Sequence, residues 1–196
     1  YLKDAVIDER TQLDQKWDLA WQLLNHGAAG RDLERVDLSA ANLTGGNFLG
    51  AHLEGAVMNG ARLTDAILKD ANLRQVDLAH ADLRRADLTR ADMRGATMAH
   101  GDLSHADLSG VHGGDVDLRH ANLRDTVLVG ANLTGCDLRE ADLSGADLNA
   151  AELTDVRLDD TTRIDDRWRA VWQIVNGQAE WSDLSQIDLG GVDLSG

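Results

Sequence analysis

Residues 81–90 read ADLRRADLTR, which is Ala-Asp-Leu-Arg-Arg followed by Ala-Asp-Leu-Thr-Arg. The same register continues every five residues from Leu33 to Leu158, and 21 of its 26 positions are leucine. The other five positions are Phe48, Met58, Met93, Met98 and Gly113. A period this regular indicates one small structural unit that is repeated many times along the chain.

Each pentad alternates small, polar and large side chains and then adds two residues that are turn-formers or long charged chains. Two residues before the leucine register, 16 of the 26 residues are Ala, and the position between them holds 12 Asp and 5 Asn. The alternation predicts a short extended segment whose small and large side chains point inward. An amphipathic helix is excluded because a period of five would place successive leucines about 140° apart. Four corners would close a square coil of about 20 residues, and coils would stack at the strand spacing of about 4.8 Å.

This pattern resembles the pentapeptide-repeat family, whose motif is Ala-(Asp/Asn)-Leu followed by two variable residues. The resemblance implies an all-β solenoid, a right-handed quadrilateral β-helix of pentapeptide repeats. With four pentads in each coil, the 26 pentads predict about 6.5 coils and a rod about 31 Å long. Stacked coils leave unpaired backbone at each end, so a cap is expected there.

All five tryptophans lie outside the pentads, and four of them mark two candidate helices. Helical spacing of apolar residues around Trp17 and Trp21, and again around Trp168 and Trp172, predicts short α-helical caps near both ends of the rod. Thr11 is the predicted N-cap of the first helix and Gly27 its stop.

The two helical segments belong to a longer internal repeat. Residues 1–45 and 152–196 align without a gap at an offset of 151, with 16 identities in 45 positions. We therefore interpret the chain as one module of a tandem array, and the tryptophan helix before the pentads is similar to segments of large cyanobacterial members of the family. The predicted parts are the tail of a preceding pentapeptide block (1–10), a helical cap (11–29), the β-helix (30–160), a second cap (161–181) and the start of a following block (182–196).

The net charge of the chain limits the classes of partner that it is expected to bind. Thirty-four acidic against 19 basic residues give a formal net charge of −15. Direct nucleic-acid binding and attraction to anionic membranes are disfavoured because both require a basic face. No apolar stretch approaches the roughly 18 residues of a membrane span, and the first residues contain no signal-peptide core. We expect a cytoplasmic protein.

Residues 20 apart should lie one above the other, so the polar position of the pentads forms vertical columns. This position carries most of the net charge and predicts an interaction surface for a protein partner with a basic surface. The alternative is that the acidic residues only keep the rod soluble. The arginines 84, 85, 90 and 94 are expected to form a local basic counter-patch. The predicted surface consists of Asp77, Asp117 and Asp137 in one column and Asp82, Asp102 and Asp142 in another.

One column is rich in histidine. His80, His100 and His120 should stack, with Glu140 next above them. Three imidazoles and a carboxylate could hold a divalent metal, but a solvated stack of like side chains is the simpler interpretation. Protonation of the column in mildly acidic solution should weaken the rod modestly.

Gly113 is the one residue of the leucine register that has no large side chain. Met93, one coil earlier in the same column, is predicted to fill the gap with its flexible side chain. The alternative is that the glycine marks a bulge or a point where a ligand approaches. Cys136 lies in the small inward register and should be a buried, inert thiol.

No arrangement of nucleophile, base and pocket stands out, and we expect neither an enzyme nor a cofactor. The favoured function is a non-enzymatic structural or protein-interaction module, a rigid acidic solenoid within a tandem repeat protein, able to stack end to end with adjacent modules. The resemblance implies an alternative, because some family members imitate duplex DNA and bind type II topoisomerases. The chain would then bind or modulate such a DNA-binding enzyme. A metal-binding rod based on the histidine column is the second alternative.

Overall fold

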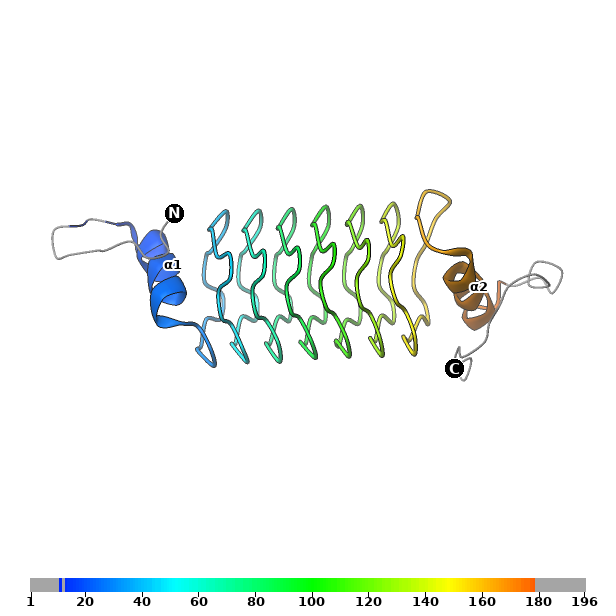
Figure 1. Cartoon of the computed structure of the whole chain (residues 1–196), viewed down its shortest axis with the longest axis horizontal. Helices are drawn as coiled ribbons and strands as arrows, with labels where there is room; N and C mark the ends of the chain where they lie inside the picture. The colour runs from blue at the N-terminus through cyan, green and yellow to red at the C-terminus, as the bar shows by residue number, and fades with distance from the viewer. Residues whose placement is uncertain (1–10, 12, 179–196) are drawn as a thin grey trace.

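The structure, a computed structural model, describes residue 11 and residues 13–178. Its helices are α1 (Gln15–His26) and α2 (Asp166–Val175). A stack of coils lies between them, with α1 at one end and α2 at the other (Figure 1). The predicted pentapeptide blocks at 1–10 and 182–196 lie outside the described residues.

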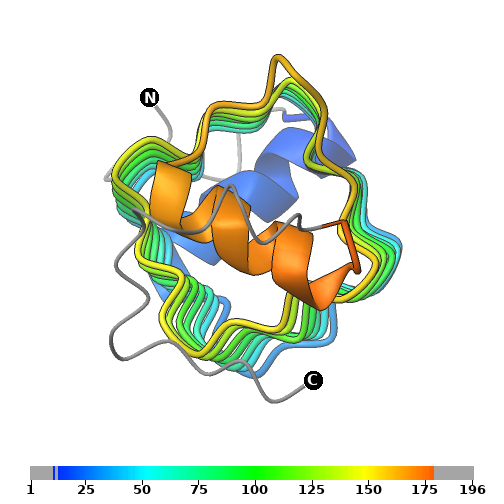
Figure 2. The same cartoon turned by 90° about the vertical axis from the view of Figure 1, so that its right-hand side faces the viewer.

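The coils are held together by parallel pairing of residues 20 apart. Bridges of this kind run from Asp32↔His52 to Asp137↔Arg157, one for each pentad. A pairing distance of 20 and a repeat of five require four sides in each coil, which confirms the predicted square coil. Viewed along the rod, successive coils overlie one another in a single outline (Figure 2).

Backbone hydrogen bonds explain why a five-residue unit is sufficient. Asp82 N donates to Ala61 O in the preceding coil (2.9 Å), and Leu83 N donates to Asp102 O in the following coil (2.7 Å). Ala86 N, at the start of the next pentad, donates to Leu83 O (3.0 Å) and closes the corner between the two pentads. Nearly every pentad uses its N–H groups in this way, and proline would remove one of them. The absence of proline from the chain follows from this geometry.

The predicted alternation of inward and outward side chains is confirmed. Ala81 and Leu83 are buried, whereas Asp82 between them is partly exposed. Phe48 is also fully buried. The inward residues form one continuous apolar cluster that runs from α1 through every coil to α2. This axis accepts leucine in almost every layer, and it leaves few positions for aromatic rings.

The 20-residue register is interrupted before α2, which the sequence interpretation did not anticipate. The last pairing, Asp142↔Arg163, joins residues 21 apart. Leu158, the final position of the leucine register, is only partly buried. The hydroxyl of Thr162 donates to Leu138 O (3.1 Å) and its backbone N–H to Asp159 Oδ1 (2.9 Å). The extra residue therefore sits in a turn that leads the chain from the last coil into α2.

Helix α1 begins later than predicted. Asp14, not Thr11, is the N-cap of α1, and its Oδ1 accepts a hydrogen bond from Trp17 N (3.0 Å). The N-cap of α2 is Asp165, which lies 151 residues after Asp14. Gly27 ends α1 with a φ of 84°, as predicted, because glycine adopts this conformation at little cost.

Each helix turns an apolar face toward the adjoining coil. Ala20 and Leu23 of α1 belong to the continuous core, as do Trp168 and Val171 of α2. Figure 2 shows α2 lying across the open end of the last coil. Within the described residues, neither helix has the length and apolar character required to cross a membrane.

Candidate functional site

The predicted histidine column exists and occupies one corner of the rod. His80, His100, His120 and Glu140 all have a positive φ between 58° and 62°, which places them at the second corner residue of their pentads. The rings of His80 and His100 stack with centroids 4.8 Å apart, and those of His100 and His120 are 4.3 Å apart. His120 Nδ1 lies 3.2 Å from Glu140 Oε2. We call these four residues the histidine corner.

The stacking geometry gives the metal-binding alternative no support. Successive rings are inclined by only 7°, and the lone pairs of an imidazole lie in its ring plane. The nitrogens of neighbouring rings therefore point side by side instead of converging on one ion, as metal ligands must. In the described part of the chain, no group of three or more His, Cys, Asp or Glu side chains could hold a metal ion.

The fold brings the predicted acidic surface to the histidine corner. One acidic column precedes the corner by three residues and the other follows it by two, so the columns flank it on two sides of the rod. Parallel bridges run along each column, through Thr97 in one and through Asn122 in the other. We call them the acidic columns, and they consist of Asp77, Asp117 and Asp137 on one side and Asp82, Asp102 and Asp142 on the other.

Four of the six carboxylates in the acidic columns are paired with arginine, so the surface is less acidic than predicted. The N···O distances are 2.8 Å for Asp82–Arg84 and for Asp117–Arg119, and 2.6 Å for Asp137–Arg139. Asp142 lies 3.4 Å from both Arg124 and Arg163. The side chain of Asp137 is only 12% exposed.

The arginines that were expected to form a basic counter-patch are each engaged with a carboxylate. Arg84 pairs with Asp82 and Arg94 with Asp92, both within the same pentad. The other two reach the preceding coil, where Arg85 pairs with Asp65 and Arg90 with Asp70. The charge of the predicted basic counter-patch is therefore neutralised, because each of its four arginines is paired with a carboxylate.

The polar position of the pentad also has a structural role that the sequence interpretation missed. Asp82 Oδ1 accepts a hydrogen bond from Arg84 N (3.3 Å), and Asp77 Oδ1 accepts one from Ala79 N (3.1 Å). The side-chain oxygen of Asn122 does the same with Arg124 N (3.3 Å). The signal was present in the mixture of Asp and Asn, because these two residues cap turns in this manner. The cap requires an oxygen acceptor and does not require its charge.

The paired carboxylates stay ionised to low pH. The hydrogen bond from Arg84 lowers the pKa of Asp82 to about 2. Hydrogen bonds from Arg119 and Arg139 likewise lower the pKa of Asp117 and Asp137. Each ion pair is therefore intact at neutral pH.

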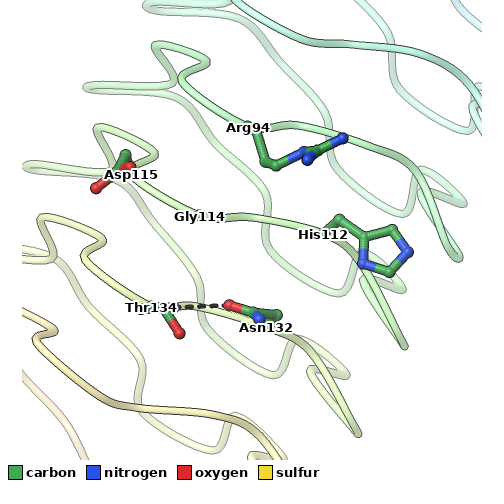
Figure 3. A pocket seen from close by; sticks show the side chains of 6 residues that line it. All are labelled: Arg94, His112, Gly114, Asp115, Asn132 and Thr134. Atoms are coloured by element: carbon green, nitrogen blue, oxygen red, sulfur yellow. Dashed lines mark hydrogen bonds between the residues drawn. The ribbon is translucent and has the colours of Figure 1, made fainter.

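A shallow pocket lies on another side of the rod, where Gly114 leaves the surface without a side chain (Figure 3). The preceding residue, Gly113, is in the inward register, and a Cβ added to it would lie 3.0 Å from Asn132 O, 3.6 Å from Leu133 Cδ2 and 3.8 Å from Met93 Cε. The space available at Gly113 is thus small, and the methyl end of Met93 borders it. The residues that line the pocket are Arg94, His112, Gly114, Asp115, Asn132 and Thr134.

Cys136 is fully buried next to this gap, and its Sγ donates a hydrogen bond to Gly113 O (2.7 Å). Burial raises the pKa of the thiol to about 12. The thiolate, which is the reactive form, is therefore scarce at neutral pH.

The register, the square coil and the inward leucines define a class of protein, and comparison with known sequences agrees. The sequence profile of pentapeptide repeats matches residues 32–70, 71–110 and 117–155, in 8 copies. The chain therefore belongs to the pentapeptide repeat family, and its fold is the right-handed quadrilateral β-helix. Proteins of this family act as structural or interaction modules.

Solved structures of pentapeptide repeat proteins resemble parts of the chain. HetL from Nostoc sp. strain PCC 7120, described as involved in heterocyst differentiation regulation, is 27% identical over 67% of this chain and 68% of its own, with a TM-score of 0.48. Rfr23 from Cyanothece 51142 is 21% identical over 69% and 86%, with a TM-score of 0.46. QnrB1, a plasmid-mediated fluoroquinolone resistance protein, is 18% identical over 74% and 96%, with a TM-score of 0.35. No curated protein matches the chain.

Proposed function

We propose that this chain is a non-enzymatic interaction module, a rigid acidic solenoid of about 6.5 coils that α1 and α2 cap within a tandem repeat protein. It acts in the cytoplasm and binds a protein partner with a basic surface. The acidic columns and the histidine corner form the binding region. The continuous core supports the rigid role, because each coil is packed against both of its neighbours.

The observation that carries the proposal is that the corner cap does not need the charge of the acidic columns. Asn122 occupies the same column as Asp102 and makes the same corner cap. Asparagine would therefore cap the other corners, yet the chain uses 12 Asp and 5 Asn at this position of the pentad. We assign to binding the charges of Asp77 and Asp102, which accept hydrogen bonds from asparagine side chains.

The test replaces carboxylates whose caps asparagine can preserve. The variant D77N/D102N removes two charges from the acidic columns, where Asp77 and Asp102 accept hydrogen bonds from asparagine side chains (both 3.0 Å). The control D87N/D107N removes two charges from a different side of the rod, where Thr89 N and Ser109 N are capped in the same way. Proteins captured by the immobilised chain would be identified by mass spectrometry at increasing salt.

We expect D77N/D102N to lose a salt-sensitive partner that wild type and D87N/D107N retain. Equal loss in both variants would show that only net charge matters, as the solubility interpretation requires. Equal retention would remove the acidic columns from the binding surface.

The alternative function, binding to a type II topoisomerase, is favoured by one feature, the recurrence of carboxylates along each acidic column at intervals of one or two coils. The pairing of four of them with arginine weakens the negative field that imitation of DNA requires. A supercoiling assay decides between the two functions. Inhibition of the enzyme by low micromolar chain, lost in D77N/D102N, would replace our first proposal.

A further inference from the structure

One side of the rod exposes large apolar side chains, although the outward positions of the repeat are mostly polar. Leu49, Ile67, Val127 and Val129 are 42%, 40%, 38% and 38% exposed. Among the described residues, the fifth exposed large hydrophobic side chain is that of Val57, which lies on another side. Four of these five side chains therefore share one side of the rod.

Two of the four apolar residues lie in a single column of polar positions. Parallel bridges connect Ile67 to Asp87, Asp87 to Asp107 and Asp107 to Val127. Over four consecutive coils, this column therefore reads apolar, acidic, acidic and apolar.

The other two apolar residues, Leu49 and Val129, lie in the adjoining column, two residues after the polar position. The hydroxyl of Ser109 in this column donates to Asp107 Oδ1 (2.6 Å), so side chains of the two columns are neighbours. Both ends of the acidic pair thus carry two apolar side chains. We call these six residues the apolar-acidic face, and they are Leu49, Ile67, Asp87, Asp107, Val127 and Val129.

The apolar residues of the polar column interrupt the corner caps. At this position Asp and Asn accept a hydrogen bond from the backbone of the corner, as Asn47 Oδ1 does from Leu49 N (3.1 Å). Ile67 and Val127 have no side-chain acceptor, so they cannot make this cap. They also expose apolar surface to water, which is unfavourable. Exposed apolar side chains that gather on one face are typical of interaction sites.

The centre of the face is negative. Asp87 and Asp107 are partly exposed and accept hydrogen bonds from Thr89 N and Ser109 N (both 2.9 Å). Within the described residues, neither carboxylate forms an ion pair. Lys69, at one end of the face, is the only cation in these two columns of the described chain. A partner that fits the face therefore has a basic centre between two apolar ends.

The spacing of the face along the rod matches an α-helix that lies parallel to it. At about 4.8 Å per coil, Asp87, Asp107 and Val127 lie about 5, 10 and 14 Å beyond Ile67. Residues i+4, i+7 and i+11 of a helix share the stripe of residue i and lie about 6, 10.5 and 16.5 Å beyond it. When the two sets are centred on each other, each layer of the face meets one residue of the stripe to within about 1 Å.

We propose that the apolar-acidic face binds an amphipathic α-helix of a partner protein. The apolar residues i and i+11 of the helix cover the two ends of the face, and lysine or arginine at i+4 and i+7 meets Asp87 and Asp107. This surface is separate from the acidic columns, and the inference does not rest on the binding role proposed for them. A second copy of the chain is a poorer occupant, because two apposed faces would bring four carboxylates together at their centre.

Fluorescence anisotropy with a labelled synthetic peptide tests the proposal on the full chain. The probe is a helix based on alanine and glutamine, with leucine at i and i+11 and lysine at i+4 and i+7. One control peptide has glutamate at i+4 and i+7, and another moves the second leucine to i+9, on the opposite side of the helix. We expect saturable binding of the probe that weakens as salt is added, and no binding of either control. A wild-type chain that does not bind the probe at up to about 1 mM, or that binds a control peptide equally well, would overturn the proposal.

The variant I67N/V127N removes the apolar ends of the face without removing a cap. Asparagine is the residue that caps corners elsewhere in the repeat, so the variant should melt at or above the temperature of wild type, as circular dichroism would show. We expect its dissociation constant for the probe to rise about tenfold. The matched control V57N makes the same change at the exposed valine on another side of the rod and should bind the probe as wild type does.

The variant D87N/D107N tests the acidic centre, because it keeps both caps and removes both charges. Its binding should be weaker than that of wild type and less sensitive to salt. D77N/D102N removes the same charge from the acidic columns and should bind the probe normally. Unchanged binding in D87N/D107N or in I67N/V127N would overturn the proposal, and so would equal weakening in D87N/D107N and D77N/D102N.

Analytical ultracentrifugation of the chain alone examines the other occupant, a second copy. We expect wild type and I67N/V127N to have the same molecular mass in solution. A wild-type dimer that I67N/V127N converts to a monomer would assign the face to a second copy and would overturn the proposed helix.

Discussion

At the scale of single residues, the polar position of the pentad does two things at once. Asp82 caps its corner through Arg84 N and forms an ion pair with the guanidinium of the same arginine. The cap needs only an oxygen acceptor, whereas the ion pair needs a charge. Aspartate and asparagine are therefore interchangeable as caps, but only aspartate adds the ion pair.

Substitution of Asp82 should separate the two roles. D82A loses both the cap and the ion pair, and we expect it to lower the free energy of unfolding at pH 7 by about 1–2 kcal/mol. D82N keeps the cap and should cost less. Urea unfolding followed by circular dichroism measures both values, and equal costs would show that the cap contributes nothing.

The ion pair of Asp82 also makes the stability of the fold depend on pH. Because the folded-state pKa of Asp82 is lowered from 3.8 to about 2, its stabilisation is complete above pH 4 and is lost as the pH falls toward 2. The difference in stability between wild type and D82N should therefore shrink over that interval. A constant difference down to pH 2 would contradict the assigned ion pair.

Met93 offers a test of packing at residue scale. M93A should cost an amount near the upper end of the roughly 2–5 kcal/mol typical of buried Met→Ala substitutions, because Gly113 supplies no side chain to close the cavity. The control M58A lies between Leu38 and Leu78 in its column and should cost less. Thermal unfolding of both variants decides the matter, and equal costs would mean that Met93 does not fill the gap at Gly113.

At the scale of elements, the unit of the fold is a corner, and the helices are the exceptions to it. Each pentad makes one bridge to each neighbouring coil and one bond within its own corner. At the last coil this pattern stops, and α2 supplies the missing donors. The indole of Trp172 and the amide of Asn176 satisfy carbonyl groups of the final coil.

We expect W172F to destabilise the C-terminal end of the rod by about 1–2 kcal/mol, because Val156 O would lose its donor while the ring stays packed. W172A should cost more, about 3–5 kcal/mol, since the ring is lost as well. Hydrogen exchange should show the effect of W172F in residues 140–176 and not near α1. A neutral W172F would mean that the indole hydrogen bond does not hold the helix in place.

At the scale of the whole molecule, the protein is a linear stack in which each coil contacts only its neighbours. Stability in such a solenoid is close to a sum of terms between adjacent coils, so a column of like side chains repeats one interaction several times. The histidine corner is such a column. Its neutral rings stack favourably, whereas protonated rings at separations of 4.3 and 4.8 Å repel one another.

We therefore expect the melting temperature of wild type to be lower at about pH 5 than at about pH 7.5. The variant H80Q/H100Q/H120Q should fall less over the same interval. Glu140 Oε2 lies 3.2 Å from His120 Nδ1 and offsets part of the repulsion, so the effect should be modest. Calorimetry at the two pH values measures it.

The matched control is H52Q/H112Q, which removes imidazoles from positions where no two histidines lie in adjacent coils of one column and keeps the contact of His105 Nδ1 with Asp125 Oδ2 (3.9 Å). Its pH dependence should equal that of wild type. If the two variants respond alike, the stack is not responsible for the acid sensitivity.

The sequence was sufficient to predict the square coil, the inward leucine register and the column of histidines, because a period of five with alternating small and large side chains is compatible with few backbones. It also placed the helices correctly, although it began α1 at Thr11 where Asp14 is the cap. The period alone was enough to place residues 20 apart in one column of the rod.

The tertiary structure alone decided how the surface charges are partnered. Whether Arg84 turns to Asp82 in its own pentad, or Arg85 to Asp65 one coil away, depends on side-chain directions at a corner that the repeat does not specify. The extra residue before α2, which shifts the final pairing to 21, was likewise invisible, because it serves the docking of the helix and not the repeat. Periodicity determines what is identical in every coil, and the exceptions at the corners and ends depend on contacts that only the folded chain makes.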